Sequence, residues 1–154
     1  ELQACVEALH TDAFPFRVEN NIEREVWKKT IINAIFNSIC PLLEVDNGVF
    51  VRDASVAQLA REVVRECVAL ADRLTLQLDE SELVAQLMLI SERSDGQLIS
   101  TLQDIRAGRE TEIAYLNQEI ASVAASLQPP QEVPRTDLLG KMLLAKSSLV
   151  RVAR

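Results

Sequence analysis

Lys29, Asn33 and Asn37 are the side chains in the first third of the chain that are best suited to bind a ligand. They follow one another at intervals of four residues, so they form one narrow polar stripe if this segment is helical. An asparagine side chain offers N–H donors and a carbonyl acceptor, and a lysine adds a positive charge and a proton. This combination suits a small anionic ligand that is rich in oxygen atoms.

The same stripe can also be interpreted as the solvated face of an amphipathic helix. A solvated face is usually built from Glu, Lys, Gln or Arg, whereas Asn is a poor helix former that competes for backbone hydrogen bonds. Two asparagines one turn apart therefore favour a role in directional hydrogen bonding, but periodicity leaves both interpretations open. The apolar residues that cover the rest of the helix are Trp27, Ile31, Ile32, Ile35, Phe36 and Ile39.

The composition excludes several classes of function. The 154 residues are 48% hydrophobic and carry a net charge of -7, so we expect one domain with its own core. Basic residues do not cluster with aromatic ones, which argues against nucleic acid as a partner. No apolar run reaches the ~18 residues of a membrane helix, and residues 1–10 lack the pattern of a signal peptide. His10 is the only histidine, so we expect neither a His-based metal site nor a Ser-His-Asp triad.

The three cysteines are Cys5, Cys40 and Cys67. Their number is odd, they are widely spaced, and their neighbours are apolar. These features predict buried thiols of a cytoplasmic protein, and they argue against disulfides or metal ligands.

The elements that would position the polar stripe begin with a short helix over residues 1–10. Residues 14–18 then alternate like a short strand. Asn20, with Glu23 three residues later, is expected to cap the helix that carries the stripe. That helix should end or bend near Pro41.

A tight turn is expected after the stripe, at Asp46-Asn47-Gly48. The rest of the chain has the periodicity of helices, with an extended proline-containing loop over residues 128–134. Asp79 and Thr136 are expected to cap two of these helices. The further helices are expected over residues 53–74, 80–90, 100–106, 111–127 and from 137 onward.

Three blocks of sequence resemble the C-terminal domain of the 2-dehydropantoate 2-reductase (ketopantoate reductase) family. The first is Trp27-x-Lys29-x-x-x-Asn33-x-x-x-Asn37, followed by Asp46-Asn47-Gly48. The second is Ser100-Thr101-Leu102-Gln103-Asp104-Ile105, then Arg109-Glu110-Thr111-Glu112-Ile113 and Tyr115-Leu116-Asn117. The third is the proline-containing loop that leads into the final helix. The resemblance extends from about residue 20 to the end, with the blocks in order.

The resemblance implies an all-α domain of the 6-phosphogluconate dehydrogenase C-terminal-like type over residues 20–154. Residues 1–19 would then be the helix–strand remnant of a preceding Rossmann domain. The family reduces ketopantoate to pantoate with NADPH, on the route to pantothenate and coenzyme A, in the cleft between its two domains. The sequence has no Gly-x-Gly-x-x-Gly turn. We therefore expect NADPH to be bound mainly by the absent Rossmann domain, and this chain to be inactive alone.

By position, the resemblance implies that Lys29 is the catalytic residue. A lysine ammonium at ~3 Å can stabilise the negative charge that hydride addition leaves on the ketone oxygen, and can then supply the proton. Glu112 matches the glutamate on the cofactor side of the cleft. The residues that match substrate-binding positions are Asn33, Asn37, Asn47 and Ser100.

The sequence departs from the family pattern at Ala114 and Gln118, where the family often has Asp and Gly. These positions concern helix packing and the subfamily more than the chemistry. Two alternatives stay open: a reductase of a related 2-keto acid, and a stand-alone helical dimerisation or interaction module without catalysis. The expected partners are a small 2-keto acid and the missing Rossmann domain, with a homodimer left open.

Overall fold

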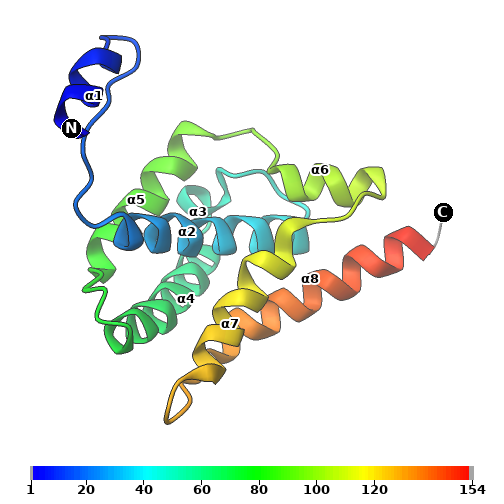
Figure 1. The fold of residues 1–154 in the computed structure, drawn as a ribbon. Helices are drawn as coiled ribbons and strands as arrows, with labels where there is room; N and C mark the ends of the chain where they lie inside the picture. The colour runs from blue at the N-terminus through cyan, green and yellow to red at the C-terminus, as the bar shows by residue number, and fades with distance from the viewer. Residues whose placement is uncertain (1, 153–154) are drawn as a thin grey trace.

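The computed structural model describes residues 2–152 (Figure 1). Helices are the only regular elements in this range, so the domain is all-α, as expected. The 3-10 helix η1 (Glu112–Tyr115) lies between α6 and α7. The α-helices are α1 (Leu2–Leu9), α2 (Ile22–Leu43), α3 (Val49–Arg52), α4 (Ala54–Arg73), α5 (Glu80–Arg93), α6 (Ser100–Ala107), α7 (Asn117–Ser126) and α8 (Pro134–Val152).

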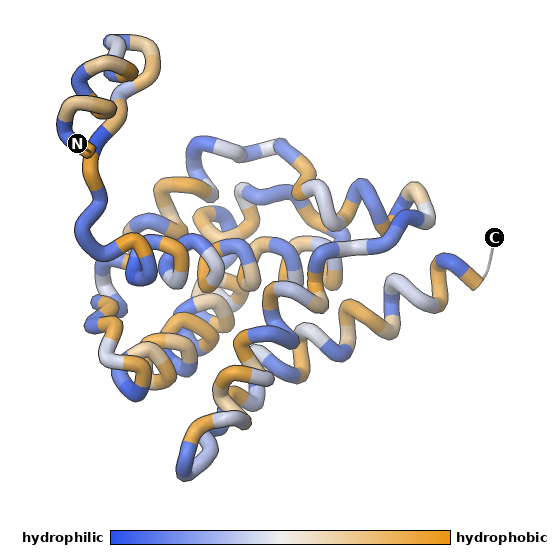
Figure 2. Tube along the Cα trace, in the orientation of Figure 1, coloured by the Kyte–Doolittle hydropathy of each residue, from blue (hydrophilic) through white to orange (hydrophobic). Residues whose placement is uncertain are grey.

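Helix α2 is the centre of the fold, with α4, α5, α6 and α8 packed against it. Its second half is apolar around most of its circumference, which is typical of a helix buried on all sides. Ile31, Ile35 and Ile39 are buried in the main core. Figure 2 shows hydrophobic residues recurring along α2 and along α4 beside it. The polar stripe is therefore carried by the helix that buries the most residues in residues 2–152.

The ends of α2 differ slightly from the prediction. The cap is Asn21, whose Oδ1 accepts the N–H of Arg24 at 3.2 Å, so the expected capping box of Asn20 and Glu23 is wrong by one residue. The helix continues through Pro41 to Leu43 and ends at Glu44, which adopts the left-handed conformation with φ 59°. Since proline has no N–H, the carbonyl of Asn37 loses its usual partner in the helical ladder.

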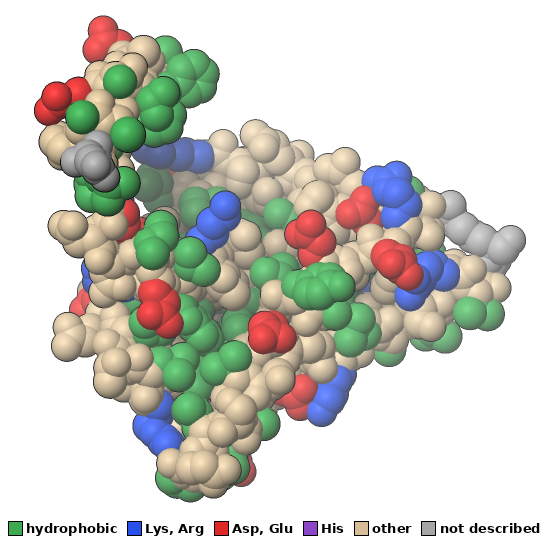
Figure 3. All heavy atoms as spheres, viewed as in Figure 1, with side chains coloured by type: hydrophobic (Ala, Val, Ile, Leu, Met, Phe, Trp, Pro, Cys, Tyr) green, Lys and Arg blue, Asp and Glu red, His purple; other side chains and the backbone are tan. Residues whose placement is uncertain are grey.

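Residues 2–20 lie apart from the helical body (Figure 1). Helix α1 buries none of its residues. The strand expected over residues 14–18 is wrong, because the described part of the chain, residues 2–152, contains no strand with which it could pair. Cys5 is exposed, which contradicts its expected burial, whereas Cys40 and Cys67 are buried. Figure 3 shows hydrophobic side chains on the surface of this N-terminal segment.

The helix expected over residues 111–127 is divided into η1 and α7. The break falls at Leu116, and it directs Asn117 against α8. Asn117 is fully buried, and its Nδ2 donates to the carbonyl of Thr136 at 3.3 Å. A Cβ at Gly140 would lie 2.8 Å from that of Asn117, so only glycine permits this approach. The side chain of Gln118 adds a hydrogen bond to the carbonyl of Asp137.

Helices α4, α5 and α6 agree with the prediction to within a few residues, whereas α3 was not predicted and the start of α8 differs. Asp79 caps α5 as expected, since its carboxylate accepts the N–H of Glu82 at 2.7 Å. Thr136 does not cap α8, which begins two residues earlier. The carboxylate of Glu66 on α4 accepts the N–H groups of Arg135 and Thr136 instead, each at 3.0 Å.

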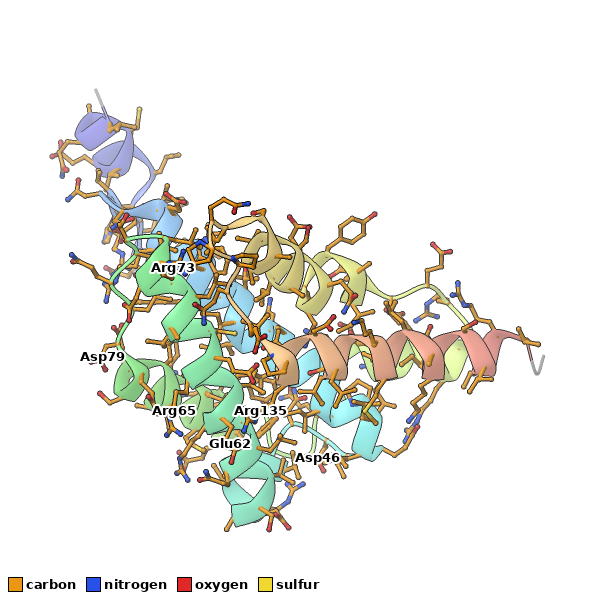
Figure 4. The ribbon with its side chains drawn as sticks, turned by 90° about the horizontal axis from the view of Figure 1, so that it is seen from below. Asp46, Glu62, Arg65, Arg73, Asp79 and Arg135 are labelled. Carbon is orange, nitrogen blue, oxygen red and sulfur yellow. The ribbon has the colours of Figure 1, made fainter. Side chains whose placement is uncertain are left out.

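Salt bridges strengthen the junction of α4 and α8. Glu62 and Glu66 both pair with the guanidinium group of Arg135. Figure 4 shows Glu62 and Arg135 close together at this junction.

No helix within residues 2–152 is long and apolar enough to cross a membrane. The same residues contain no cluster of three or more His, Cys, Asp or Glu side chains that could hold a metal ion.

Candidate functional site

The α2 stripe passes from the surface into the core. Lys29 is exposed, Asn33 is half-buried and Asn37 is only 9% exposed. Eight residues of helix rise about 12 Å, so the stripe forms a polar track of that length. Within residues 2–152, Lys29 makes no hydrogen bond or ion pair, so its ammonium group is available to a ligand. Whether these side chains bind a substrate stays a prediction.

Lys28, the residue before Lys29, is engaged in the fold. It is 5% exposed, and its Nζ contacts the carboxylates of Glu82 and Glu25, the latter at 3.0 Å. Burial lowers the pKa of Lys28, but the hydrogen bonds from Glu82 and Glu25 outweigh this effect and leave the pKa above its ordinary value. Arg24 also pairs with Glu82, at 3.1 Å. These contacts tie α2 to the start of α5.

Asn37 is held in one orientation at the buried end of the stripe. The hydroxyl of Thr101 donates to its Oδ1 at 2.6 Å, and its Nδ2 donates to the carbonyl of Asn33 at 2.8 Å. One N–H of the amide is left for a further partner. The bond to Thr101 also joins α2 to the first turn of α6.

Asn47 is a buried residue as well as a turn residue. Its backbone N–H donates to the carbonyl of Gln97 at 2.9 Å, and its own carbonyl accepts the hydroxyl of Ser91 at 2.7 Å. The side chain is 8% exposed, and its Oδ1 has no hydrogen-bond partner among the described residues. Buried polar atoms are rarely left without a partner, so this oxygen is a candidate for contact with a ligand or a water molecule.

Asp46 fixes the turn that carries Asn47. One of its carboxylate oxygens accepts the N–H groups of Gly48 at 2.8 Å and Gly96 at 3.2 Å, and Arg52 pairs with the carboxylate at 2.8 Å. The hydrogen bond from Arg52 is the main cause that holds the pKa of Asp46 below its ordinary value. Asp46 thus joins the α2–α3 turn to the α5–α6 connection; Figure 4 labels its place after α2.

Ser100 is the first residue of α6 and is exposed. The N-cap position is Ile99, which supplies no side-chain hydrogen bond, so Ser100 does not act as the cap. It lies directly before Thr101, which contacts Asn37, and three residues after Gln97, which contacts Asn47. The α5–α6 connection thus contacts Asn37 through Thr101 and the turn of Asn47 through Gln97, and Ser100 lies on this connection.

Glu112 is the exposed first residue of η1, which packs against α2. No hydrogen bond or ion pair in residues 2–152 joins it to the α2 stripe. Its placement on the cofactor side of a cleft stays a prediction. Nε of Arg109 donates to the carboxylate of Asp104 at 2.8 Å, beside η1 in the chain.

Sequence reasoning missed the residues that hold the site in place. These are Thr101 and Ser91, whose partners lie 64 and 44 positions away along the chain. Asp46 was expected as a turn residue, but its contacts with Gly96 and Arg52 were not predicted. Thr101 of α6 contacts α2, and Ser91 of α5 contacts the α2–α3 turn, so no local spacing could show these contacts.

Comparison with known proteins gives consistent matches. A family model described as "Ketopantoate reductase PanE/ApbA C terminal" matches residues 21–147. A relative from Pyrococcus horikoshii, named 2-dehydropantoate 2-reductase, is 35% identical over 134 residues, which cover 86% of this chain and 43% of the relative. The chain therefore spans less than half the length of that relative.

Two solved structures share the fold. A PanE/ApbA family ketopantoate reductase from Ralstonia eutropha JMP134 has a TM-score of 0.78 at 26% identity, over 89% of this chain and 45% of that one. A D-mandelate dehydrogenase, solved with NADH and anilino(oxo)acetate, has a TM-score of 0.86 at 22% identity, over 97% of this chain and 62% of that one. At that identity, the second likeness supports the fold alone.

Proposed function

Because the chain belongs to the ketopantoate reductase PanE/ApbA C-terminal family, we propose that it is the substrate-side domain of an NADPH-dependent 2-keto acid reductase. The proposed reaction is the reduction of ketopantoate to pantoate. The observation that carries the proposal is the α2 stripe, where an unpaired lysine at the surface leads to a buried and fixed asparagine amide.

In the proposed mechanism, Lys29 acts on the ketone oxygen. A bound nicotinamide cofactor supplies the hydride that adds to the ketone carbon. The ammonium group of Lys29 stabilises the negative charge that develops on the oxygen, and it donates the proton that completes the alcohol. Asn33 and Asn37 offer neutral N–H donors beside it. Ser100 and Asn47 bind the carboxylate and hydroxyl groups of the substrate.

We propose that a Rossmann domain holds most of the cofactor. The sequence has no glycine-rich phosphate turn. The family resemblance assigns Glu112 to the cofactor side. Residues 1–19 are proposed to belong with that domain and residues 20–154 to form the substrate domain. The exposure of Leu2, Leu9, Phe14 and Phe16 supports this division, since exposed apolar surface usually meets a partner.

A second candidate function is dimerisation. Leu138, Met142, Leu149 and Val152 are exposed large apolar residues on α8, spaced so that they follow one side of the helix. This stripe favours a second copy as partner, either in a homodimeric reductase or in a module without catalysis. Analytical ultracentrifugation of the chain and of Leu149→Glu tests it: the substitution should convert a dimer into a monomer, whereas a monomeric parent chain contradicts the candidate.

The proposed reaction can be tested by joining residues 20–154 to the part of the Pyrococcus horikoshii relative that this chain does not cover. We expect ketopantoate-dependent NADPH oxidation by the joined protein, and a comparison with other branched 2-keto acids will define the substrate. Lys29→Ala should abolish most of the activity. Lys141→Ala is the matched control, because Lys141 is an exposed lysine whose one ion-pair partner among residues 2–152 is Asp137 on the same helix. Equal activity of both variants would contradict the assigned role of Lys29.

A further inference from the structure

Thr101 links the two elements that carry candidate substrate ligands. It follows Ser100 in the first turn of α6, and its hydroxyl donates to Oδ1 of Asn37 on α2 at 2.6 Å. Thr101 is only 3% exposed, so it is not itself placed to bind a ligand from solvent. A buried hydrogen bond thus connects residues 64 positions apart at the buried end of the polar stripe.

The chemistry of this contact determines the orientation of the Asn37 amide. The carbonyl of Asn33 can only accept a hydrogen bond, so the amide must turn Nδ2 towards it, at 2.8 Å. Oδ1 then faces Thr101, whose hydroxyl is its donor. Without that hydroxyl, Oδ1 would be a buried acceptor without a partner, and the free N–H of Nδ2 would lose its fixed direction.

The same contact sets the position of Ser100. The α5–α6 connection is bonded at Gln97 to the turn of Asn47, and at Thr101 to Asn37. Ser100 lies between these two points, and its hydroxyl makes no hydrogen bond with residues 2–152. Thr101 therefore fixes both the amide of Asn37 and the start of α6, where Ser100 lies.

We propose that Thr101 is a positioning residue for the 2-keto acid substrate: its hydroxyl aligns Asn37 with Ser100 so that both can contact one small anion. This inference rests on the proposed function, and it adds a residue that acts through another. It requires that loss of the hydroxyl weakens ligand binding by more than a general loss of stability would.

The experiment uses the complete 154-residue chain, labelled with ¹⁵N and titrated with ketopantoate while NMR follows its asparagine side-chain amides. Thr101→Val removes the hydroxyl at nearly constant shape, and Thr101→Ser restores it. Thr136→Val is the matched control, because Thr136 is also buried and its hydroxyl also donates to a side chain on another helix, Glu66, at 3.2 Å. Thermal unfolding of each variant is measured in parallel.

We expect Thr101→Val to weaken ketopantoate binding roughly 3- to 10-fold and to suppress the shift of the Asn37 amide. Thr101→Ser should bind like the parent chain. Thr136→Val should lose a similar amount of stability and bind normally. Equal weakening by both valine variants, or no weakening by Thr101→Val, overturns the inference.

The unmodified chain gives an independent check if Thr101→Val fails to fold. Ketopantoate should shift one Nδ2 proton of Asn37, the proton that is not bonded to Asn33, more than the other. If the signals of Asn33 and Ser100 shift in the parent chain while both Nδ2 protons of Asn37 stay unchanged, the inference about Thr101 is overturned but the proposed substrate site is not. A parent chain in which none of these groups responds contradicts the proposed substrate site itself.

Discussion

Lys28 and Lys29 are neighbours in the chain but have opposite surroundings. Lys28 is buried between the carboxylates of Glu25 and Glu82, whereas Lys29 is exposed and has no partner in the described residues 2–152. Successive residues of a helix point about 100° apart, so one lysine faces α5 while the next faces outward. The fold therefore assigns a structural role to one and leaves the other free for chemistry.

This contrast predicts that substitution of Lys29 lowers activity, whereas substitution of Lys28 lowers stability. In the joined reductase, Lys29→Ala should lower kcat by roughly 10²- to 10⁴-fold, the effect of losing a positioned acid with its charge, without loss of stability. Lys28→Met should instead lower the free energy of unfolding by about 1–3 kcal/mol, because it leaves buried and partly buried polar groups without their partner. Steady-state kinetics and urea unfolding of both variants check this. Retention of more than half of kcat by Lys29→Ala would disprove its role.

Substitution of Asn33 and Asn37 by alanine should show whether the α2 stripe binds a ligand or is only a solvated helix face. Asn33 is half-buried and its side chain has no hydrogen bond within residues 2–152, so Asn33→Ala should be neutral or stabilising by up to ~0.7 kcal/mol. Asn37→Ala should destabilise by about 1–3 kcal/mol, because it leaves the buried hydroxyl of Thr101 unpaired. Each substitution should lower kcat/KM of the joined protein by an amount that corresponds to ~1–3 kcal/mol of lost transition-state stabilisation. Unchanged kinetics in both variants would return the stripe to the solvated interpretation.

The turn that carries Asn47 should loosen in acid. Arg52 and the N–H groups of Gly48 and Gly96 lower the pKa of Asp46. The stability that Asp46 contributes is therefore fully present above its unfolded value of about 3.9, and it is lost as the pH falls through the lower folded value. Asp46→Asn should lower the free energy of unfolding at neutral pH, where the parent chain is most stable. The free energy of unfolding of the variant should also fall less steeply as the pH is lowered. The measurement is urea unfolding between neutral pH and about pH 2. If the stability of the variant depends on pH as that of the parent does, Asp46 does not stabilise the turn through its charge.

The three cysteines should differ in reactivity. Burial is the main cause that raises the pKa of both Cys40 and Cys67 to about 12, so both thiols stay protonated and inaccessible at neutral pH. Cys5 is exposed on α1. We expect iodoacetamide to modify Cys5 alone in the native chain and all three cysteines in denaturant, as read by peptide mass spectrometry. Modification of Cys67 before Cys5 would contradict the packing of α4 against α8.

The sequence was sufficient for most of the helices but not for the contacts between them. Helical periodicity located α4, α5, α6 and the α2 stripe, because this signal is local, and the family blocks then implied roles for the stripe. The break at Leu116 was missed because it depends on the approach of Asn117 to Gly140 of α8. Glu66 as the cap of α8 was missed for the same reason, since it acts from another helix.

The N-terminal segment shows a different limit of sequence reasoning. The alternation over residues 14–18 is a real strand pattern, but a strand needs a partner to satisfy its backbone, and residues 2–152 provide none. The side chains of Phe14 and Phe16 are exposed instead. Their exposure supports the proposed division near residue 19, since exposed apolar surface usually meets a partner.

The most direct test of the two-domain account is the rate at which the purified 154-residue chain consumes NADPH in the presence of ketopantoate. The chain lacks a glycine-rich phosphate turn, so it should not hold a hydride donor against the substrate. Holding the two reactants together is worth ~7–11 kcal/mol of barrier, and its loss should abolish turnover rather than reduce it. We therefore predict a folded helical protein that consumes no NADPH above the rate without protein. Steady NADPH consumption by this chain alone, or a Kd for NADPH below about 1 µM, would contradict the account.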